Sequence, residues 1–153
     1  MTELARASLG KRILAIFYDL LIVLFLSFII TLIVQTLIIQ LNFVELETVQ
    51  ISKTESISAI PSDSAINSFL KSLWLTIPFL YFVYYWTKQD RTLGMKVWKI
   101  KAVSSNQLAI TWLQSAIRFT FSLFGLGYLW MVIDKDNLPL QDRISKTRLI
   151  KVD

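Results

Sequence analysis

The sequence predicts an all-α integral membrane protein with two transmembrane helices, a third apolar segment broken by glycines, and a small cytoplasmic β-hairpin. Apolar residues make up 54% of the 153-residue chain, and the mean hydropathy is +0.54, both above the values of an ordinary soluble domain. These residues gather in runs long enough to cross a bilayer, and basic residues flank the runs. We therefore expect a single membrane domain over residues 1–153.

The composition also excludes several kinds of chemistry. The chain has no Cys and no His, which excludes disulfides, thiolate nucleophiles, histidine-based catalytic pairs and zinc sites built on those residues. No catalytic residue, metal site or cofactor is expected. The net charge is +5, but the basic residues border apolar runs, so the anionic inner leaflet of a membrane is the expected partner rather than nucleic acid.

The first membrane helix is expected at about residues 12–41. Few polar residues interrupt this run, and a span needs about 20 apolar residues. A signal peptide has an apolar core of only ~7–15 residues followed by a small-residue cleavage site, which this run lacks, so we expect an uncleaved anchor. One acidic residue, Asp19, lies inside the run, two helical turns after Arg12.

A second membrane helix is expected at about residues 67–87. Aromatic residues mark its two ends, with Trp74 towards one end and the aromatic run 84–86 at the other, as is typical of membrane interfaces. Lys71 lies in an outer turn, where its ammonium can reach the headgroups. The helix therefore has the composition of a second span.

A third apolar segment is expected at residues 112–133. Thr111 and Gln114 form a capping box that fixes a helix start, and Gly125 and Gly127 offer a break at its centre. Two alternatives remain open. The segment is either a re-entrant or interfacial hairpin folded at the glycines, which we favour, or a single third span.

The orientation follows from the counts of lysine and arginine. They number three in residues 1–12, one in 42–67 and five in 88–111. Because these residues collect on the cytoplasmic side, we expect a multi-pass plasma-membrane protein with a cytoplasmic N-terminus and the loop 42–66 outside. Five more basic residues in the tail, 134–153, favour a cytoplasmic tail, which requires the hairpin alternative, whereas a single span would leave the tail outside.

The polar connectors carry strand signals. Residues 95–110 combine a partly alternating apolar and basic run with a turn cluster at 104–107, which predicts a β-hairpin. Residues 147–152 form another strand-like run, which can pair with this hairpin only if the tail is cytoplasmic. The outer loop, 42–66, has apolar residues among polar ones and is expected to hold a short strand or an interfacial helix.

Four sequence elements, taken in order, resemble the RDD family of membrane proteins, which is named for one arginine and two aspartates. The elements are Gly10–Asp19 with the family's arginine at Arg12 and first aspartate at Asp19, Arg91–Lys96, Arg118, and Leu140–Thr147 with the second aspartate at Asp142. Each element alone is weak, but four in the right order and spacing are specific. The resemblance spans residues 10–152.

The resemblance implies a membrane domain whose shared biochemical role is poorly defined. Transport of unidentified ligands has been proposed for the family. Some members look like cation/proton antiporters, and others look like accessory subunits of membrane proteolytic machinery. One departure is Gln141, which stands where the family commonly has a histidine, so any role of that histidine is absent from this chain.

Asp19 is the residue that most needs a partner. A carboxylate inside the bilayer costs about 2.5–3.5 kcal/mol unless it is paired or neutralised. Arg12 lies on nearly the same helix face. With Arg118 and Asp142, these residues are expected to form one polar network at the inner leaflet. The network either pins the third segment onto the first helix or handles a ligand, proton or cation.

Ser27, Thr31 and Gln35 follow Asp19 along the first helix and form a polar ridge, here called the polar lane. Such residues commonly join membrane helices through hydrogen bonds worth about 0.6 kcal/mol each. The alternative is that the ridge forms a path for an ion.

Two functions fit these observations. The first is a non-catalytic accessory or regulatory subunit that binds a larger membrane complex, which the small size and the outer loop favour. The second is a transporter of a cation, proton or small solute that assembles as a homo-oligomer, because two or three spans do not easily enclose a pathway. The sequence has no inverted repeat to support the second.

Catalysis is not expected. Tyr18 and Asp19 match the first half of an intramembrane aspartyl protease site, but Tyr128 stands where its G-x-G-D half needs aspartate.

Overall fold

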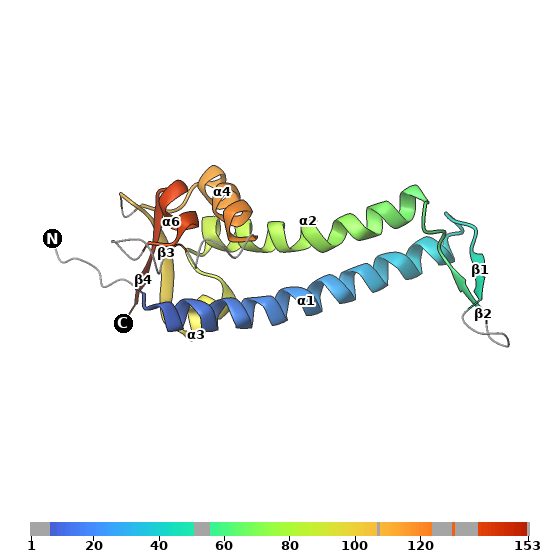
Figure 1. Cartoon of the computed structure of the whole chain (residues 1–153), viewed down its shortest axis with the longest axis horizontal. Coiled ribbons are helices and arrows are strands. Elements are labelled where there is room, and N and C mark those ends of the chain that lie inside the picture. Colours follow the sequence, from blue (N-terminus) through green and yellow to red (C-terminus); the bar gives the residue numbers. More distant parts are fainter. Residues whose placement is uncertain (1–6, 51–55, 107, 124–129, 131–137, 153) are drawn as a thin grey trace. The chain divides into compact units, whose positions relative to one another are not determined.

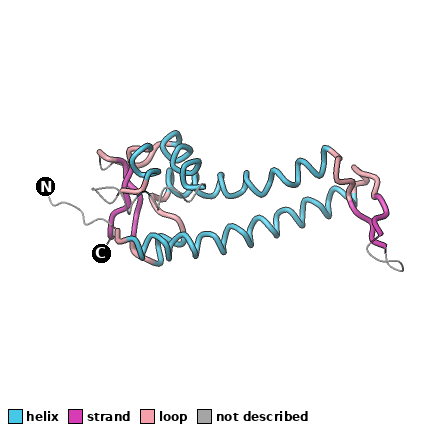
Figure 2. The backbone as a smooth tube through the Cα atoms, in the orientation of Figure 1, coloured by secondary structure: helices cyan, strands magenta, loops and turns pink. Residues whose placement is uncertain are grey.

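A computed structural model describes residues 7–50, 56–106, 108–123, 130 and 138–152 (Figure 1). The described part is mostly helical, with short strands (Figure 2). The elements are α1 Leu9–Gln40, β1 Glu47–Gln50, β2 Ser56–Ala59, α2 Ala65–Lys88, α3 Leu93–Val97, β3 Ile100–Ser104, α4 Trp112–Leu123, α6 Leu140–Ile144 and β4 Thr147–Lys151. They form two compact units, Leu24–Pro78 and the remainder, and α1 and α2 contribute to both.

The two long helices, α1 and α2, are long and apolar enough to cross a membrane. With 32 and 24 residues, they extend for about 48 and 36 Å, more than the ~30 Å hydrocarbon core of a bilayer. The large apolar side chains of α1 are mostly exposed, and Phe25 reaches 69%. A core helix of a soluble protein would bury them. The helices predicted at about 12–41 and 67–87 are therefore present, within three residues of their expected bounds.

Local signals set the ends of these helices. After α1 the backbone turns at Asn42, whose φ is 54°, and the N–H of Phe43 donates to the carbonyl of Ile38 at 3.1 Å. This is a Schellman motif, in which asparagine tolerates the left-handed position that glycine often takes. At the start of α2 the Ser64 hydroxyl accepts the backbone N–H of Asn67 at 3.1 Å.

The unit Leu24–Pro78 contains the β1–β2 hairpin between the two long helices. The strands are antiparallel, and the register places Val49 opposite Ile57. Both side chains are exposed. The prediction of a short strand in the outer loop is thus confirmed, and the structure adds a second strand that pairs with it.

The other unit contains a two-stranded antiparallel sheet of β3 and β4, in which Ile100 lies opposite Lys151 and Ser104 opposite Thr147. The strand predicted at residues 147–152 is confirmed for Thr147–Lys151, and the pairing with the connector that was left conditional is present. The β-hairpin predicted at residues 95–110 is present only in part: Ile100–Ser104 is a strand, but residues 95–97 belong to the helix α3 and residues 108–110 form no second strand. Ser104 donates its N–H to the carbonyl of Leu108 at 3.0 Å, which closes the turn. The next helix starts at Trp112, so too few residues remain for a strand.

The helix start predicted at Thr111 is confirmed. The Thr111 N–H donates to Oε1 of Gln114 at 3.1 Å, and the Gln114 N–H donates to Oγ1 of Thr111 at 3.3 Å. The described part of α4 runs to Leu123. The break predicted at Gly125 and Gly127 lies outside the described residues.

The tail joins the same unit as the start of α1. The backbone N–H of Ala7 donates to the carbonyl of Leu149 at 3.0 Å, so the chain before α1 lies along β4. A small apolar core fills this unit, and its buried members are Ala7, Ala15, Trp86, Met95, Ile100, Ala102, Ile110, Phe119 and Leu149. The start of α1, the connector and the tail are therefore parts of one packed body.

Candidate functional site

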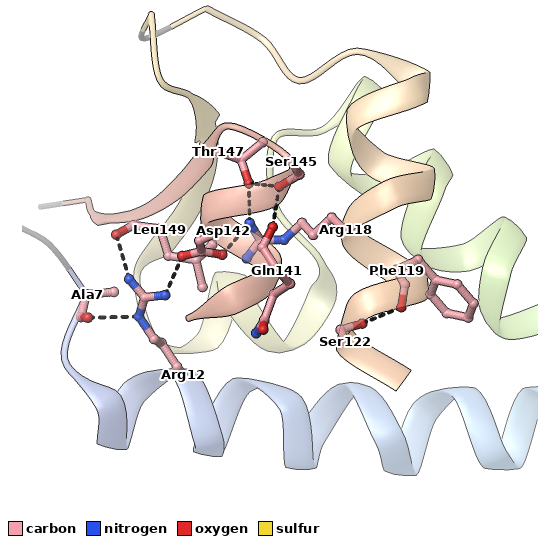
Figure 3. A network of polar contacts seen from close by, with 10 residues as sticks. All are labelled: Ala7, Arg12, Arg118, Phe119, Ser122, Gln141, Asp142, Ser145, Thr147 and Leu149. Carbon is pink, nitrogen blue, oxygen red and sulfur yellow. Dashed lines mark hydrogen bonds and ion pairs between the residues drawn. The ribbon is translucent and has the colours of Figure 1, made fainter. Parts of the chain in front are cut away.

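The four residues predicted to form one network are divided between two clusters, both in the unit that holds the tail. Arg12, Arg118 and Asp142 form the first, which we call the arginine cluster (Figure 3). Asp19 belongs to the second, which also contains Tyr81, Thr92 and Gly94 and which we call the aspartate clasp.

Asp142 is the centre of the arginine cluster. Its Oδ2 lies 2.6 Å from Nη1 of Arg12, and its Oδ1 lies 2.7 Å from Nη1 of Arg118. The first contact is an aligned hydrogen bond, whereas the second is an ion pair without hydrogen-bond geometry. All three side chains are at most 2% exposed. One carboxylate therefore joins two buried guanidinium groups from different helices.

Arg12 connects the start of α1 to the tail. Its Nε donates to the carbonyl of Ala7 at 3.0 Å, and its Nη2 donates to the carbonyl of Leu149 in β4 at 3.5 Å. Side chains on a helix lean towards its N-terminus, which aims this guanidinium away from the apolar run. Together with the bond to Asp142, the fork of Arg12 holds three separate chain segments (Figure 3).

Arg118 connects α4 to the same tail. Its Nη1 donates to Oγ1 of Thr147 at 2.6 Å, and its guanidinium lies 5.1 Å from the ring centre of Trp86 near the end of α2. Stacking of a guanidinium on an aromatic face stabilises a buried cation. Arg118 thus links the tail, α4 and α2 through one side chain.

Short-range bonds hold Asp142 and Thr147 in place. Asp142 is in the first turn of α6, where a negative charge interacts favourably with the helix dipole. The Ser145 hydroxyl donates to the carbonyl of Gln141 at 2.5 Å and lies 2.7 Å from Oγ1 of Thr147. The Gln141 amide is completely buried, and neither of its polar atoms has a hydrogen-bond partner in the described part of the chain.

The aspartate clasp binds Asp19 of α1 through uncharged donors. Its Oδ1 accepts the Tyr81 hydroxyl at 2.9 Å and the backbone N–H of Gly94 at 2.8 Å, and its Oδ2 accepts the Thr92 hydroxyl. The same Thr92 oxygen caps α3 by accepting the N–H of Met95 at 3.2 Å. Asp19 is 1% exposed. The clasp therefore docks the start of α3 onto α1.

Gly94 makes this docking possible. A Cβ added at Gly94 would lie 2.2 Å from the carbonyl oxygen of Ala15 and 2.9 Å from Cγ of Asp19. Real Cβ atoms do not approach backbone atoms so closely, so only glycine allows the two backbones to meet here.

The expectation that Asp19 belongs to one network with Arg12 was wrong. Among the described residues, the hydrogen-bond partners of the Asp19 carboxylate are two hydroxyls and one backbone N–H. The two residues share a helix face but are seven residues apart, about 10 Å along the axis. Arg12 points towards the chain ends, and the groups closest to Asp19 come from α2 and α3.

The polar lane is only partly buried. The Ser27 side chain is 1% exposed, and the hydroxyls of Ser27 and Thr31 have no hydrogen-bond partner in the part of the chain that the structure describes. Gln35 is exposed. These residues lie in the unit Leu24–Pro78, apart from both clusters.

Sequence reasoning missed Tyr81 and Trp86 as partners of the buried charges. It also gave Thr92 no role beyond its place in a motif. A signal existed for Thr92 and Gly94, because a hydroxyl residue followed by a short helical turn is a typical cap. Tyr81 lies away from the aromatic ends of α2, and its position between apolar residues was the only hint of a buried hydroxyl contact.

The charged groups of the two clusters bind and position other segments of the same chain. Each charged group contacts donors or acceptors of the same chain, and none of the four predicted side chains is more than 2% exposed. Within the described ranges, no group of three or more acidic residues is close enough to hold a metal ion.

Comparison with known proteins gives one finding. The sequence matches the family model described as RDD family over residues 6–146, nearly the whole chain. The match confirms the resemblance read from Arg12, Asp19, Arg118 and Asp142. No curated protein and no solved structure matches the chain.

Proposed function

The chain belongs to the RDD family, and from this premise we propose that it is a small non-catalytic membrane protein that serves as an accessory or regulatory subunit of a larger membrane complex. The carrying observation is that Arg12 and Arg118 both form ion pairs with Asp142 inside a packed unit. A charged site for a passing substrate would need groups that are open to it. These groups instead hold the tail and α4 onto α1.

The binding surface for the larger complex is the exposed apolar surface of α1. Its large side chains include Phe25 at 69%, Phe28 at 53% and Leu21 at 53% exposure. Lipid chains cover such a surface as well as protein does, so a partner helix gains by close packing and interhelical bonds rather than by the hydrophobic effect.

The proposed orientation keeps the N-terminus, the connector 88–111 and the tail in the cytoplasm, with the loop 42–66 outside, at the plasma membrane. The pairing of β3 with β4 supports a common side for the connector and the tail. Because the chain has no cysteine, single cysteines at exposed Ser58 and Ser105 report the two sides directly.

An impermeant maleimide added to intact cells tests this orientation. We expect Ser58→Cys to react at once and Ser105→Cys to react only after permeabilisation. Immediate reaction of Ser105→Cys, with Ser58→Cys protected, would reverse the orientation.

A photo-crosslinking amino acid at Phe25 tests the accessory role. We expect it to give an adduct with a second membrane protein in stoichiometric amount, whereas the same group at Ser105 gives none. Mass spectrometry of the purified adduct identifies the partner. Adducts that contain only copies of this chain would refute the accessory role.

A homo-oligomeric transporter of a cation, proton or small solute is the second candidate. The observation in its favour is that the hydroxyls of Ser27 and Thr31 are buried and have no hydrogen-bond partner among the described residues. Proteoliposomes that contain the purified chain should then carry a cation or proton flux that the double substitution Ser27→Ala and Thr31→Ala abolishes. A homo-oligomer with such a flux would favour transport, and liposomes without flux favour the accessory role.

A further inference from the structure

We propose that α4 is an interfacial helix whose outer face is embedded at the headgroup–acyl boundary of the phospholipid leaflet that meets the start of α1 and the end of α2. The inference rests on the membrane placement of the two long helices under the proposed function. It adds a third membrane contact, by an element that lies along the surface instead of crossing the bilayer.

In α4 a charged residue is buried while large apolar residues are exposed. Its buried face contains Ser115, Arg118 and Phe119, which are at most 4% exposed. Leu113 lies on the opposite face and Trp112 at the start of the helix, and each is 62% exposed. In water, a helix turns its apolar stripe inwards and its charged residues outwards. A helix that buries arginine and exposes tryptophan and leucine fits an apolar surrounding on its outer side.

The contacts of Arg118 place the middle of α4 at the ends of the long helices. Arg118 pairs with Asp142, which also pairs with Arg12 in the first turn of α1. Its guanidinium also lies on Trp86, two residues before the end of α2. The ends of spans lie at the membrane boundary, so α4 is held at that depth.

Phe119, the residue after Arg118, also packs against α2. Its ring centre lies 5.4 Å from that of Phe79 and 5.8 Å from that of Phe82, both in the last three turns of α2. Trp112 at the start of α4 is the residue type most enriched at the membrane boundary.

The charge of the surrounding unit complements an anionic leaflet. Lys96, Lys99, Lys146 and Lys151 are all exposed in this unit. Each basic residue near an anionic surface adds to the attraction. Lipid headgroups therefore fit both the apolar face of α4 and the basic groups of its unit.

Spin labels on single introduced cysteines measure the depth of α4. The chain has no native cysteine that would also be labelled. Single nitroxide labels at Leu113→Cys, Ala116→Cys and Thr120→Cys lie along the outer face. The full-length protein is placed in bilayers of phosphatidylcholine and phosphatidylglycerol. Depth is read from the ratio of collisions with oxygen to collisions with a water-soluble nickel complex. Labels at Phe25→Cys and Ser105→Cys give the bilayer and aqueous references.

We expect the three α4 labels to lie at shallow depths that differ by less than one helical turn, about 5 Å. A transmembrane orientation would make the label at 120 deeper or shallower than that at 113 by about 10 Å, because each residue rises 1.5 Å. That result, or labels as accessible to nickel as Ser105→Cys, would overturn the proposal.

The reference at Phe25 separates this inference from the proposed function. If Phe25→Cys is deep while the α4 labels are aqueous, only the interfacial helix is refuted. If Phe25→Cys is itself aqueous, the membrane placement of α1 fails and both proposals fall. Unchanged Tm of the labelled variants shows that each is folded, since all three positions are outside the buried face.

Discussion

The arginine cluster buries Arg12 and the aspartate clasp buries Asp19, and both residues belong to α1. The two sites compensate the buried charge in different ways. In the cluster, Asp142 contacts two guanidinium groups, so opposite charges offset the loss of water. In the clasp, Asp19 accepts hydrogen bonds from two hydroxyls and one N–H, so neutral dipoles offset the loss of water. The cluster joins segments more than a hundred residues apart, and the clasp fixes one short helix.

This difference predicts unequal responses to the same chemical change. Removing one charge from an ion pair leaves the opposite charge buried and unpaired. Removing one donor from a carboxylate with three donors leaves two in place. Substitutions in the cluster should therefore cost more than substitutions in the clasp.

Asp142→Asn should have the largest effect. It leaves two buried guanidinium groups without an anionic partner, and we expect a loss of about 3–5 kcal/mol in the free energy of unfolding. Titration with a denaturing detergent in mixed micelles, followed by tryptophan fluorescence, measures it. Asp63→Asn changes the same group at an exposed position and should stay within about 0.5 kcal/mol of the unchanged protein. A cost as small as the control's would show that the cluster carries no stability.

Gly94→Ala should come next. The added Cβ meets the Ala15 carbonyl at 2.2 Å, so α3 must move away from α1. Overpacking of this kind costs about 1–3 kcal/mol. The matched control is Gly10→Ala, which has open space around it within α1 and should be neutral or slightly stabilising. Equal Tm values for the two variants would contradict the close approach of α3.

Asp19→Asn should cost about 2 kcal/mol, less than the same change at Asp142, because the amide oxygen still accepts the Gly94 N–H while its NH₂ group no longer accepts the Thr92 hydroxyl. The variant also separates the structural role from a ligand role. A variant that folds with unchanged stability but loses activity would refute the structural interpretation.

Tyr81→Phe should have the smallest effect, about 1 kcal/mol, because it removes one of three donors to Asp19 and leaves the ring in place. Unfolding in the same mixed micelles measures it. Tyr84→Phe is the control, since the Tyr84 side chain is 55% exposed. A loss larger than that of Asp19→Asn would mean that the ranking within the clasp is wrong.

Much of the fold follows from local signals in the sequence. The apolar runs and Asn42 set the extent of α1, and Thr111 with Gln114 sets the start of α4. The strand-like run in residues 147–152 predicted β4, and the charge count of the tail allowed its pairing with the connector. The helix ends and the strand depend on a few neighbouring residues, and the charge count depends on the summed charge of a segment. Both can be read directly from the sequence.

The sequence predicted contact partners only where both side chains carry a full charge. Arg12 and Arg118 each attract Asp142, which the family resemblance had singled out, so a network among the three could be inferred. Asp19 was assigned to that network because a buried carboxylate was expected to need a charged partner. A carboxylate can equally be satisfied by any nearby hydroxyl or N–H, and a sequence contains many of these. Which of them comes close depends on the close packing at Gly94, a three-dimensional fact.

The central claim is that the buried charges hold the tail onto α1, and a double-mutant cycle between Arg12 and Asp142 tests it most directly. The four proteins are the unchanged chain, Arg12→Met, Asp142→Asn and the double variant, and the free energy of unfolding is measured for each in mixed micelles. We predict a coupling energy of about 2–3 kcal/mol, because each substitution alone strands the other partner. A coupling energy within about 0.5 kcal/mol of zero would contradict the claim.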